Sequence, residues 1–401
     1  ILILYGERDY QVADEDLQLW EEAARLYGRV LETTEEGSER ELDLVRRRVL
    51  ALSRLMGREE DALEMFERLL ERDPFEPTAF RAMLELFERE KAHDRARLTR
   101  QVLSALNCEV ERDRVRTKKA PSRSFGTEAV ERYLLPETLD GDTFHLLMKL
   151  MPLAEKVCSE ELPQRKVLDG RSLDSEGSLS DALSDAMSAF EVGRYGAELG
   201  DSGPPAPQVF GASNPDVWFN EDVVGEMTDS ELYFTAGYVA SLGWSGLAPA
   251  LELDGRRLWH LAEGTWLRQN GSGFEERVDV NSQKMSEAIG SPFLAVTRRR
   301  VVKAIEPVVE ELPEAQCELW PEAIEEFACR VGLVLCGDLA AAIRSVLRFR
   351  GWQADLQAPE TREHITRIDL VGRLIRFAYS QDYLEARYEV GLSGRPSELT
   401  I

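Results

Sequence analysis

Histidine and cysteine are the side chains that most often bind metals, carry protons or attack substrates, and this sequence contains few of either. The four histidines are isolated from one another: His93, His145, His260 and His364. The five cysteines are scattered, form no C-x-x-C pair and suit a reducing compartment: Cys108, Cys158, Cys317, Cys329 and Cys336. A metal site built from His145, His260 and Glu325 is disfavoured. Arg256 and Arg257 lie beside His260 in the sequence and would repel a cation. We therefore expect neither a metal nor another cofactor.

Short catalytic motifs are also missing. The sequence contains no G-x-S-x-G nucleophile elbow, no phosphate-binding loop and no dinucleotide fingerprint. The stretches FGASNPD and NGSGFEE are typical of turns, because neither has a strand before it and a helix after it in the required relation. The densest basic cluster, residues 297–303, leads into an apolar-periodic segment and indicates a helix with exposed arginines. No active site is therefore evident from short motifs.

Residues 228–243 are the most clearly delimited helix that the sequence predicts. Thr228 and Glu231 have the T-x-x-E spacing of a capping box, which fixes the N-terminus of this helix. The segment is nearly apolar all round, with Val239 and Leu242 one turn apart, as in a helix buried in a core. An amphipathic helix and several short β-prone segments precede it. We therefore expect a small sheet followed by a buried helix.

The order of these segments resembles that of the CAAX-prenyl-protease-like zinc peptidases. In that family a small sheet and an L-x-x-x-E-L segment precede the helix that carries the H-E-x-x-H motif. The residues that fall on this frame are Val224, Met227, Glu231 and Leu232. The two histidines of the motif bind zinc, and its glutamate takes a proton from the zinc-bound water. This chain has Tyr238, Val239 and Leu242 at those three positions, and they supply neither a ligand pair nor a base.

A second segment resembles the helix that carries the family's third zinc ligand. The family pattern E-x-x-A-D-R-x-G is matched by Glu325, Ala328, Arg330 and Gly332, whereas Cys329 replaces the aspartate. One potential ligand of three remains, and a single carboxylate does not hold zinc against water. The resemblance therefore implies a pseudoenzyme without metal or catalytic residues. Its vestigial positions are Tyr238, Val239, Leu242, Glu325 and Cys329.

The resemblance extends to large bacterial tetratricopeptide-repeat proteins whose terminal domain looks like such a peptidase without its metal. It is carried by G-L-x-L-C-G-D-L at residues 332–339 and by a closing segment that begins at Asp369. It covers about residues 180–392. The alternative is a generic α+β domain whose helix happens to follow a capping box.

An internal repeat near the start of the chain agrees with that resemblance. Ala62, Phe66 and Pro74 have the spacing of the second helix of a tetratricopeptide repeat, and Ala96 follows Ala62 by 34 residues. Residues 15–107 therefore resemble about three helical hairpins of a short solenoid. The alternative is an irregular helical bundle.

In such solenoids the first helix of each hairpin lines a groove that holds an extended peptide. The repeat register places four arginines in this groove: Arg47, Arg54, Arg81 and Arg89. Because a guanidinium can bind a carboxylate through two hydrogen bonds, we expect a protein or peptide partner there. The alternative is a solvated helix face of mixed charge.

Length and charge set the wider expectations. A chain of 401 residues, 43% of them hydrophobic, is long enough for two or three domains. Its net charge of −25 opposes binding to nucleic acid, and no apolar run reaches the roughly 20 residues that span a membrane. We expect a cytoplasmic protein and, because the chain begins without Met or a leader, a part of a longer one.

The expected fold class is mainly α. We predict tetratricopeptide-like helical repeats in residues 1–125 and a helical linker region in residues 126–178. Residues 179–401 are predicted to form a degenerate metallopeptidase-like α+β domain with a small sheet.

Three functional hypotheses follow. The first is a non-catalytic scaffold or adaptor that combines a helical-repeat module with a peptidase-like pseudoenzyme domain. The second is a hydrolase or other enzyme that reuses the old cleft with Tyr238 and Glu325 as acid and base. The third, compatible with the first, is that the former active-site helix is now simply part of the core.

Overall fold

The structure is a computed structural model. It describes residues 14–106, 120–162, 168–173, 177–211, 214–270, 279–290, 295–309, 317–352, 355–356 and 358–393. The chain forms two compact units. Unit 1 contains residues 1–115, 356–379 and 397–401, and unit 2 contains residues 116–355 and 380–396. These units differ from the predicted domains, because residues 356–379, which we placed in the second domain, group with the first helices.

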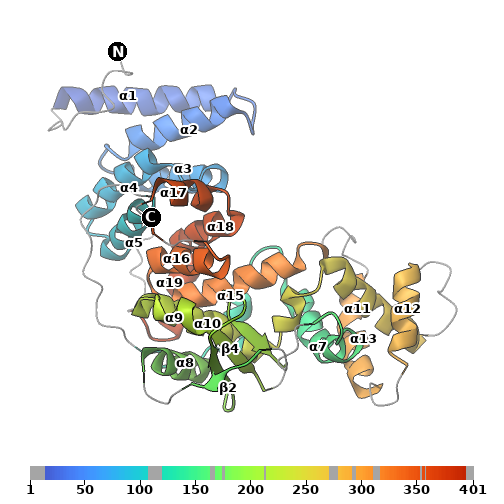
Figure 1. Cartoon of the computed structure of the whole chain (residues 1–401). Helices are drawn as coiled ribbons and strands as arrows, with labels where there is room; N and C mark the ends of the chain where they lie inside the picture. The colour runs from blue at the N-terminus through green and yellow to red at the C-terminus, as the bar shows by residue number, and fades with distance from the viewer. Residues whose placement is uncertain are drawn as a thin grey trace. The chain divides into compact units, whose positions relative to one another are not determined.

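Unit 1 consists of helices in the part of the chain that is described. Its helices are α1 (Asp14–Leu31), α2 (Glu39–Leu52), α3 (Glu59–Arg72), α4 (Pro77–Arg89), α5 (His93–Ala105), α17 (Pro359–Thr366) and α18 (Asp369–Tyr379). Helix α2 packs against α1 and α3, and α4 packs against α5 (Figure 1). Helix α18 contacts α3 and α5. The predicted helices are confirmed, and their membership of a repeat solenoid stays a prediction.

Aromatic side chains form the centre of unit 1. Phe66 of α3 is completely buried and meets Phe80 of α4 edge to face, with ring centroids 5.3 Å apart. Tyr379, at the end of α18, meets Phe66 at 5.4 Å, and its hydroxyl donates a 2.7 Å hydrogen bond to Thr99 Oγ1. Edge-to-face rings and a satisfied buried hydroxyl both favour this packing. Residues far apart in the sequence therefore share one core.

Unit 2 combines helices with a small sheet. Its strands are β1 (Arg171–Ser172), β2 (Gly196–Gly200), β3 (Gln208–Phe210) and β4 (Asp216–Asn220). Its first helices are α6 (Thr127–Tyr133), α7 (Gly141–Val157), α8 (Ser178–Ala189), α9 (Glu221–Gly225) and α10 (Asp229–Ser245), followed by the 3₁₀ helix η3 (Ala248–Leu251). The later ones are α11 (Gly255–Asn270), α12 (Val280–Ala288), α13 (Ala295–Val309), α15 (Trp320–Cys336), α16 (Leu339–Phe349) and α19 (Gln381–Glu389). No helix among the described residues is long and apolar enough to cross a membrane.

The sheet is mixed, with strand order β1-β2-β4-β3. Strands β2 and β4 are parallel and pair Ala197 with Val217, whereas the two outer pairs are antiparallel. Val217, Trp218 and Phe219 of β4 are buried, so this strand anchors the sheet in the core. The small sheet before α10 was predicted. Strand β1 was not, because its segment, rich in Ser, Asp and Gly, is typical of a loop.

Helices α10 and α15 cross at two glycines. A Cβ atom on Gly237 would lie 2.9 Å from the Cα atom of Gly332, and a Cβ on Gly332 would lie 2.7 Å from the Phe234 carbonyl oxygen. Such distances leave no space for a methyl group. Small residues at a crossing let two helix backbones approach closely. The crossing therefore fixes the separation between the side chains that α10 and α15 carry.

Replacing Gly237 by Ala should destabilise unit 2. Alanine is the better helix former by about 1 kcal/mol, but the added methyl group has to separate two backbones, and overpacking costs about 1–3 kcal/mol. Urea unfolding followed by circular dichroism should show a lower midpoint. Gly225→Ala is the matched control, because a Cβ there meets nothing within 4 Å. Equal midpoints for the two variants would contradict the close crossing.

Candidate functional site

A pocket of about 540 Å³ lies in unit 2. Its walls come from α7, from β3 and the residues before it, from α10, from η3 and from the first turns of α15. Such a volume is within the range of small-molecule sites, about 300–1,000 Å³. Among the described residues it is the pocket that adjoins the predicted positions.

Three of the five vestigial positions line this pocket. Tyr238 and Leu242 come from α10 and Glu325 from α15, so the helix crossing brings them together. Val239 and Cys329 are fully buried and lie outside the lining. Val239, at the position that the resemblance assigns to the catalytic glutamate, therefore packs in the core. The three residues at the assigned ligand positions line the pocket.

Glu325 is bound by an arginine that the sequence did not single out. Arg350, the residue that ends α16, donates from Nη2 to both carboxylate oxygens of Glu325, at 3.0 and 3.2 Å. Both side chains are about 30% exposed. A guanidinium on both oxygens neutralises the carboxylate and engages one lone pair of each oxygen, so that a metal ion would have to compete with Arg350. No sequence pattern links residues 25 positions apart on different helices.

Tyr238 is 5% exposed, and its ring lies 5.2 Å from that of Phe349. Its hydroxyl has no hydrogen-bond partner among the described residues. The hydroxyl oxygen is not fully enclosed by protein atoms, and it is open to the pocket that Tyr238 lines. Burial, and then the negative charge of Glu325, raise the pKa of Tyr238 well above its ordinary value. At neutral pH the pocket therefore contains an uncharged phenol.

The remaining lining is acidic and apolar. Glu155, Glu252 and Glu322 also line the pocket, and no lysine or arginine does so among the described residues. Burial raises the pKa of Glu252. Apolar side chains complete the walls, among them Val209 and Leu251. No group of three histidine, cysteine or acidic residues in the described part of the chain could hold a metal ion.

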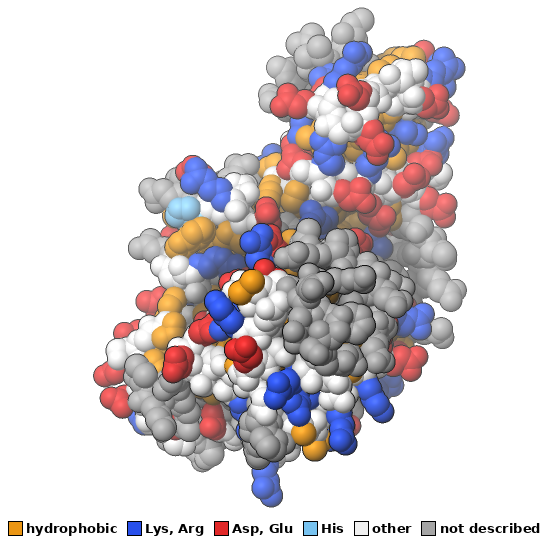
Figure 2. Space-filling view, turned by 90° about the vertical axis from the view of Figure 1, so that its right-hand side faces the viewer, with side chains coloured by type: hydrophobic (Ala, Val, Ile, Leu, Met, Phe, Trp, Pro, Cys, Tyr) orange, Lys and Arg blue, Asp and Glu red, His pale blue; other side chains and the backbone are white. Residues whose placement is uncertain are grey.

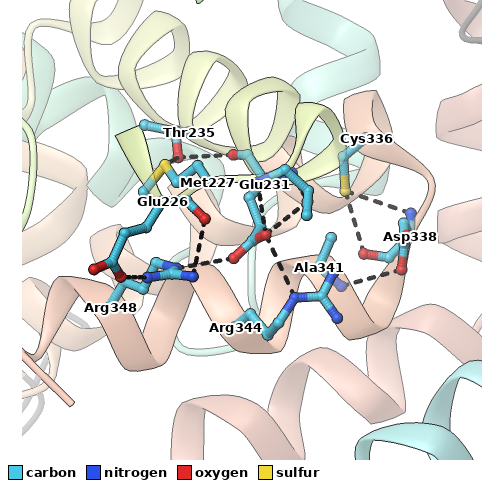
Figure 3. A network of polar contacts seen from close by, with 10 residues as sticks. Glu226, Met227, Glu231, Thr235, Cys336, Asp338, Ala341, Arg344 and Arg348 are labelled. Atoms are coloured by element: carbon cyan, nitrogen blue, oxygen red, sulfur yellow. Dashed lines mark hydrogen bonds and ion pairs between the residues drawn. The ribbon is translucent and has the colours of Figure 1, made fainter. Parts of the chain in front are cut away.

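A buried carboxylate positions the start of α10. Glu231 is completely buried and closes a capping box: its Oε2 accepts a 2.9 Å hydrogen bond from the Thr228 backbone N–H. Arg348 donates to Glu231 Oε1 at 3.0 Å, and Arg344 lies 3.4 Å from Glu231 Oε2 (Figure 3). Arg348 also binds the Glu226 carboxylate at 2.6 Å. The capping box was predicted and is confirmed, whereas its two arginine partners were missed.

The same network joins α10 to α16. Helix α15 ends at Gly337, whose φ of 63° lies in the left-handed region that favours glycine. Asp338 then caps α16 by accepting a 3.0 Å hydrogen bond from the Ala341 N–H (Figure 3). This sharp break turns the chain so that Arg344 and Arg348 face Glu231. The G-L-x-L-C-G-D-L segment therefore contains the end of α15, the turn at Gly337 and Asp338, and the first residue of α16.

Glu231 has an unusually stable ionised form. Burial alone would raise its pKa, but hydrogen bonds from Thr228 and the charges of Arg344 and Arg348 outweigh this and lower the pKa below its ordinary value. A carboxyl group with a lowered folded pKa stabilises the fold above the pKa of the unfolded chain. That contribution is lost as the pH falls through the folded value.

Two of the four histidines have close partners that are not histidines. His145 Nε2 lies 2.7 Å from Glu131 Oε1. His260 Nδ1 lies 2.9 Å from Ser282 Oγ, which donates a 2.6 Å hydrogen bond to Glu263. Ser282 is completely buried, so this serine cannot attack a substrate. Neither histidine lines the pocket with Glu325.

The four predicted groove arginines lie on α2, α4 and the turn after α2. Arg47 pairs with Asp43 at 2.9 Å, and Arg54 pairs with Glu85 of α4 at 2.7 Å. Arg89 donates to the backbone carbonyl groups of Ser53 and Leu55. Arg81 is exposed and has no ion pair among the described residues. Acidic and basic side chains are interspersed over the face drawn in Figure 2.

Comparison with known proteins adds nothing to these observations: no family model, curated protein or solved structure matches the chain. The peptidase-like and repeat-like assignments therefore depend on the motifs alone.

Replacing Glu231 by Gln should destabilise unit 2 by about 3 kcal/mol, because it leaves Arg344 and Arg348 without their buried counter-charge. Glu221→Gln is the matched control; its partner Arg171 is 54% exposed, so the loss should stay below about 1 kcal/mol. Urea unfolding at pH 7 measures both.

The difference between wild type and Glu231→Gln should shrink as the pH falls below about 4.3, the ordinary pKa of a glutamate, because the unfolded wild-type chain then takes up a proton that the folded chain does not. A difference that is small at pH 7, or that grows as the pH falls, would contradict the role of this network.

Proposed function

We propose that this chain is a non-catalytic binding protein, with a helical module for a protein or peptide partner and a peptidase-like pocket that works without metal. The observation that carries this proposal is the double hydrogen bond from Arg350 to Glu325 inside the pocket. Tyr238 and Leu242 occupy the two other candidate ligand positions. A zinc site requires three or four protein ligands, and these residues offer one carboxylate that is already neutralised.

The alternative of an enzyme with Tyr238 and Glu325 as acid and base has less support. A general acid or base works best when its pKa lies near the working pH, whereas the pKa of Tyr238 is raised well above its ordinary value. Both carboxylate oxygens of Glu325 already accept hydrogen bonds from Arg350, which would compete with a proton from a substrate. The geometry therefore favours binding over proton transfer.

The partner-binding half of the proposal concerns unit 1. Of the four predicted arginines, Arg81 has the side chain most available to a carboxylate of a partner, because the other three already bind groups of their own helices or of neighbouring helices. Exposed arginines of this kind can bind acidic side chains or a C-terminal carboxylate. The proposed partner is therefore a protein or peptide with an acidic contact.

Elemental analysis of the purified chain tests the metal-free pocket. We expect less than stoichiometric zinc, and a melting temperature that EDTA does not change, since no zinc contributes to stability. Arg350→Met frees Glu325 and should still not create a zinc site. One zinc per chain that disappears in Glu325→Gln but stays in the control Glu318→Gln would refute the proposal.

Substitution at Arg81 tests the partner-binding half. Arg81→Glu should reduce the amount of a stable partner that is recovered with the tagged chain, because a like charge would then face the acidic contact. Arg367→Glu is the control, since Arg367 is exposed in unit 1 and outside the predicted groove. Recovery of no stable partner, or equal recovery by both variants, would contradict this half.

A further inference from the structure

The pocket in unit 2 is lined by both apolar and acidic side chains. Leu162, Val209 and Leu251 are among the apolar ones, and no lysine or arginine lines it among the described residues. An enclosed apolar wall favours a ligand with an apolar body. Because Arg350 already neutralises Glu325, Glu252 is the carboxylate that favours a positive charge on that ligand.

The phenol of Tyr238 gives this pocket a specific polar point. Tyr238 is only 5% exposed, and its hydroxyl has no hydrogen-bond partner among the described residues. A hydroxyl that opens into a pocket without a protein partner is available to a bound ligand. A ligand with an N–H group would supply a hydrogen bond, because the phenol oxygen accepts.

Charges around this phenol favour a cationic donor. The negative charges of Glu325 and Glu252 raise the pKa of Tyr238, whereas the positive charge of Arg350 lowers it. The side chain of Glu252 itself has no hydrogen bond or ion pair among the described residues. A positive charge bound near it would be its counter-charge.

We propose that the pocket binds an organic ammonium ion with an apolar body, whose N–H groups contact the Tyr238 hydroxyl and whose charge faces Glu252. The apolar body packs against Leu242 and the neighbouring apolar walls. This inference rests on the proposed function, since it needs a pocket without metal. It differs from a metal site because an ammonium ion brings its own hydrogen-bond donors and needs only one or two acceptors.

Calorimetric titration in EDTA tests the proposal with three probes of equal chain length: octylammonium, octanol and octanoate. Octylammonium should bind about tenfold more tightly than octanol, the ratio expected for one charge-assisted hydrogen bond. Octanoate should bind more weakly than octanol, because its charge is repelled. Binding of octanol or octanoate as tightly as octylammonium, or binding of none of the three, would overturn the proposal.

Two substitutions locate the binding. Tyr238→Phe keeps the ring and removes the acceptor, and Glu252→Gln removes the charge from an exposed side chain whose loss does not threaten folding. Each should weaken octylammonium binding about tenfold, and Glu252→Gln should leave octanol binding unchanged. The control Asp222→Asn changes an exposed carboxylate of α9 outside the pocket and should behave like wild type.

Octylammonium affinities that are the same in Glu252→Gln and Asp222→Asn would overturn the proposal even if Tyr238→Phe failed to fold. This outcome is distinct from failure of the proposed function, which is decided by zinc content. A chain without zinc that ignores octylammonium refutes only the ligand class, whereas a chain with stoichiometric zinc refutes the metal-free pocket itself.

Discussion

The close crossing of α10 and α15 is the constraint on which the rest of unit 2 depends. Because Gly237 and Gly332 leave no space between the backbones, the side chains of both helices meet at fixed distances. Tyr238 and Leu242 on one helix and Glu325 on the other then share a pocket. The turn at Gly337 and Asp338 returns the chain as α16, and its arginines hold the start of α10 through Glu231. The ion pairs of Glu231 thus hold the N-terminus of α10 against α16, and Gly237 sets how closely the centre of α10 approaches α15.

Arginine determines the chemistry of this arrangement. Arg344 and Arg348 keep a completely buried carboxylate ionised at the helix cap, and Arg350 keeps the pocket carboxylate neutralised. All three come from α16 or the residue that ends it. Breaking a buried pair of this kind is costly, because the remaining charge has no counter-charge. The arginines of α16 therefore stabilise the fold, and Arg350 neutralises the carboxylate at the predicted third ligand position.

Local patterns in the sequence predicted much of this fold. The capping box at Thr228 and Glu231, the all-round burial of α10 and the small sheet before it depend on neighbouring residues, and the structure confirms each. Contacts between distant residues were not predictable in this way. Arg350 meets Glu325 across a gap of 25 residues, and Tyr379 joins the core of unit 1 from far along the chain. Strand β1 was missed because two residues in a polar segment carry no periodicity.

The candidate site was predictable as a set of positions but not as an environment. The motif frame pointed to Tyr238, Leu242 and Glu325, which do line one pocket, yet it also included Val239 and Cys329, which pack in the core. Charge balance in a pocket depends on which helices fold back over it, and Glu252 and Arg350 became visible only in three dimensions. The most direct measurement of the central claim is a crystal structure of the chain grown with excess zinc, with anomalous data at the zinc edge. We expect no zinc peak in the pocket and Arg350 on both oxygens of Glu325. A zinc peak bound to Glu325, with Arg350 displaced, would show that the pocket is a metal site.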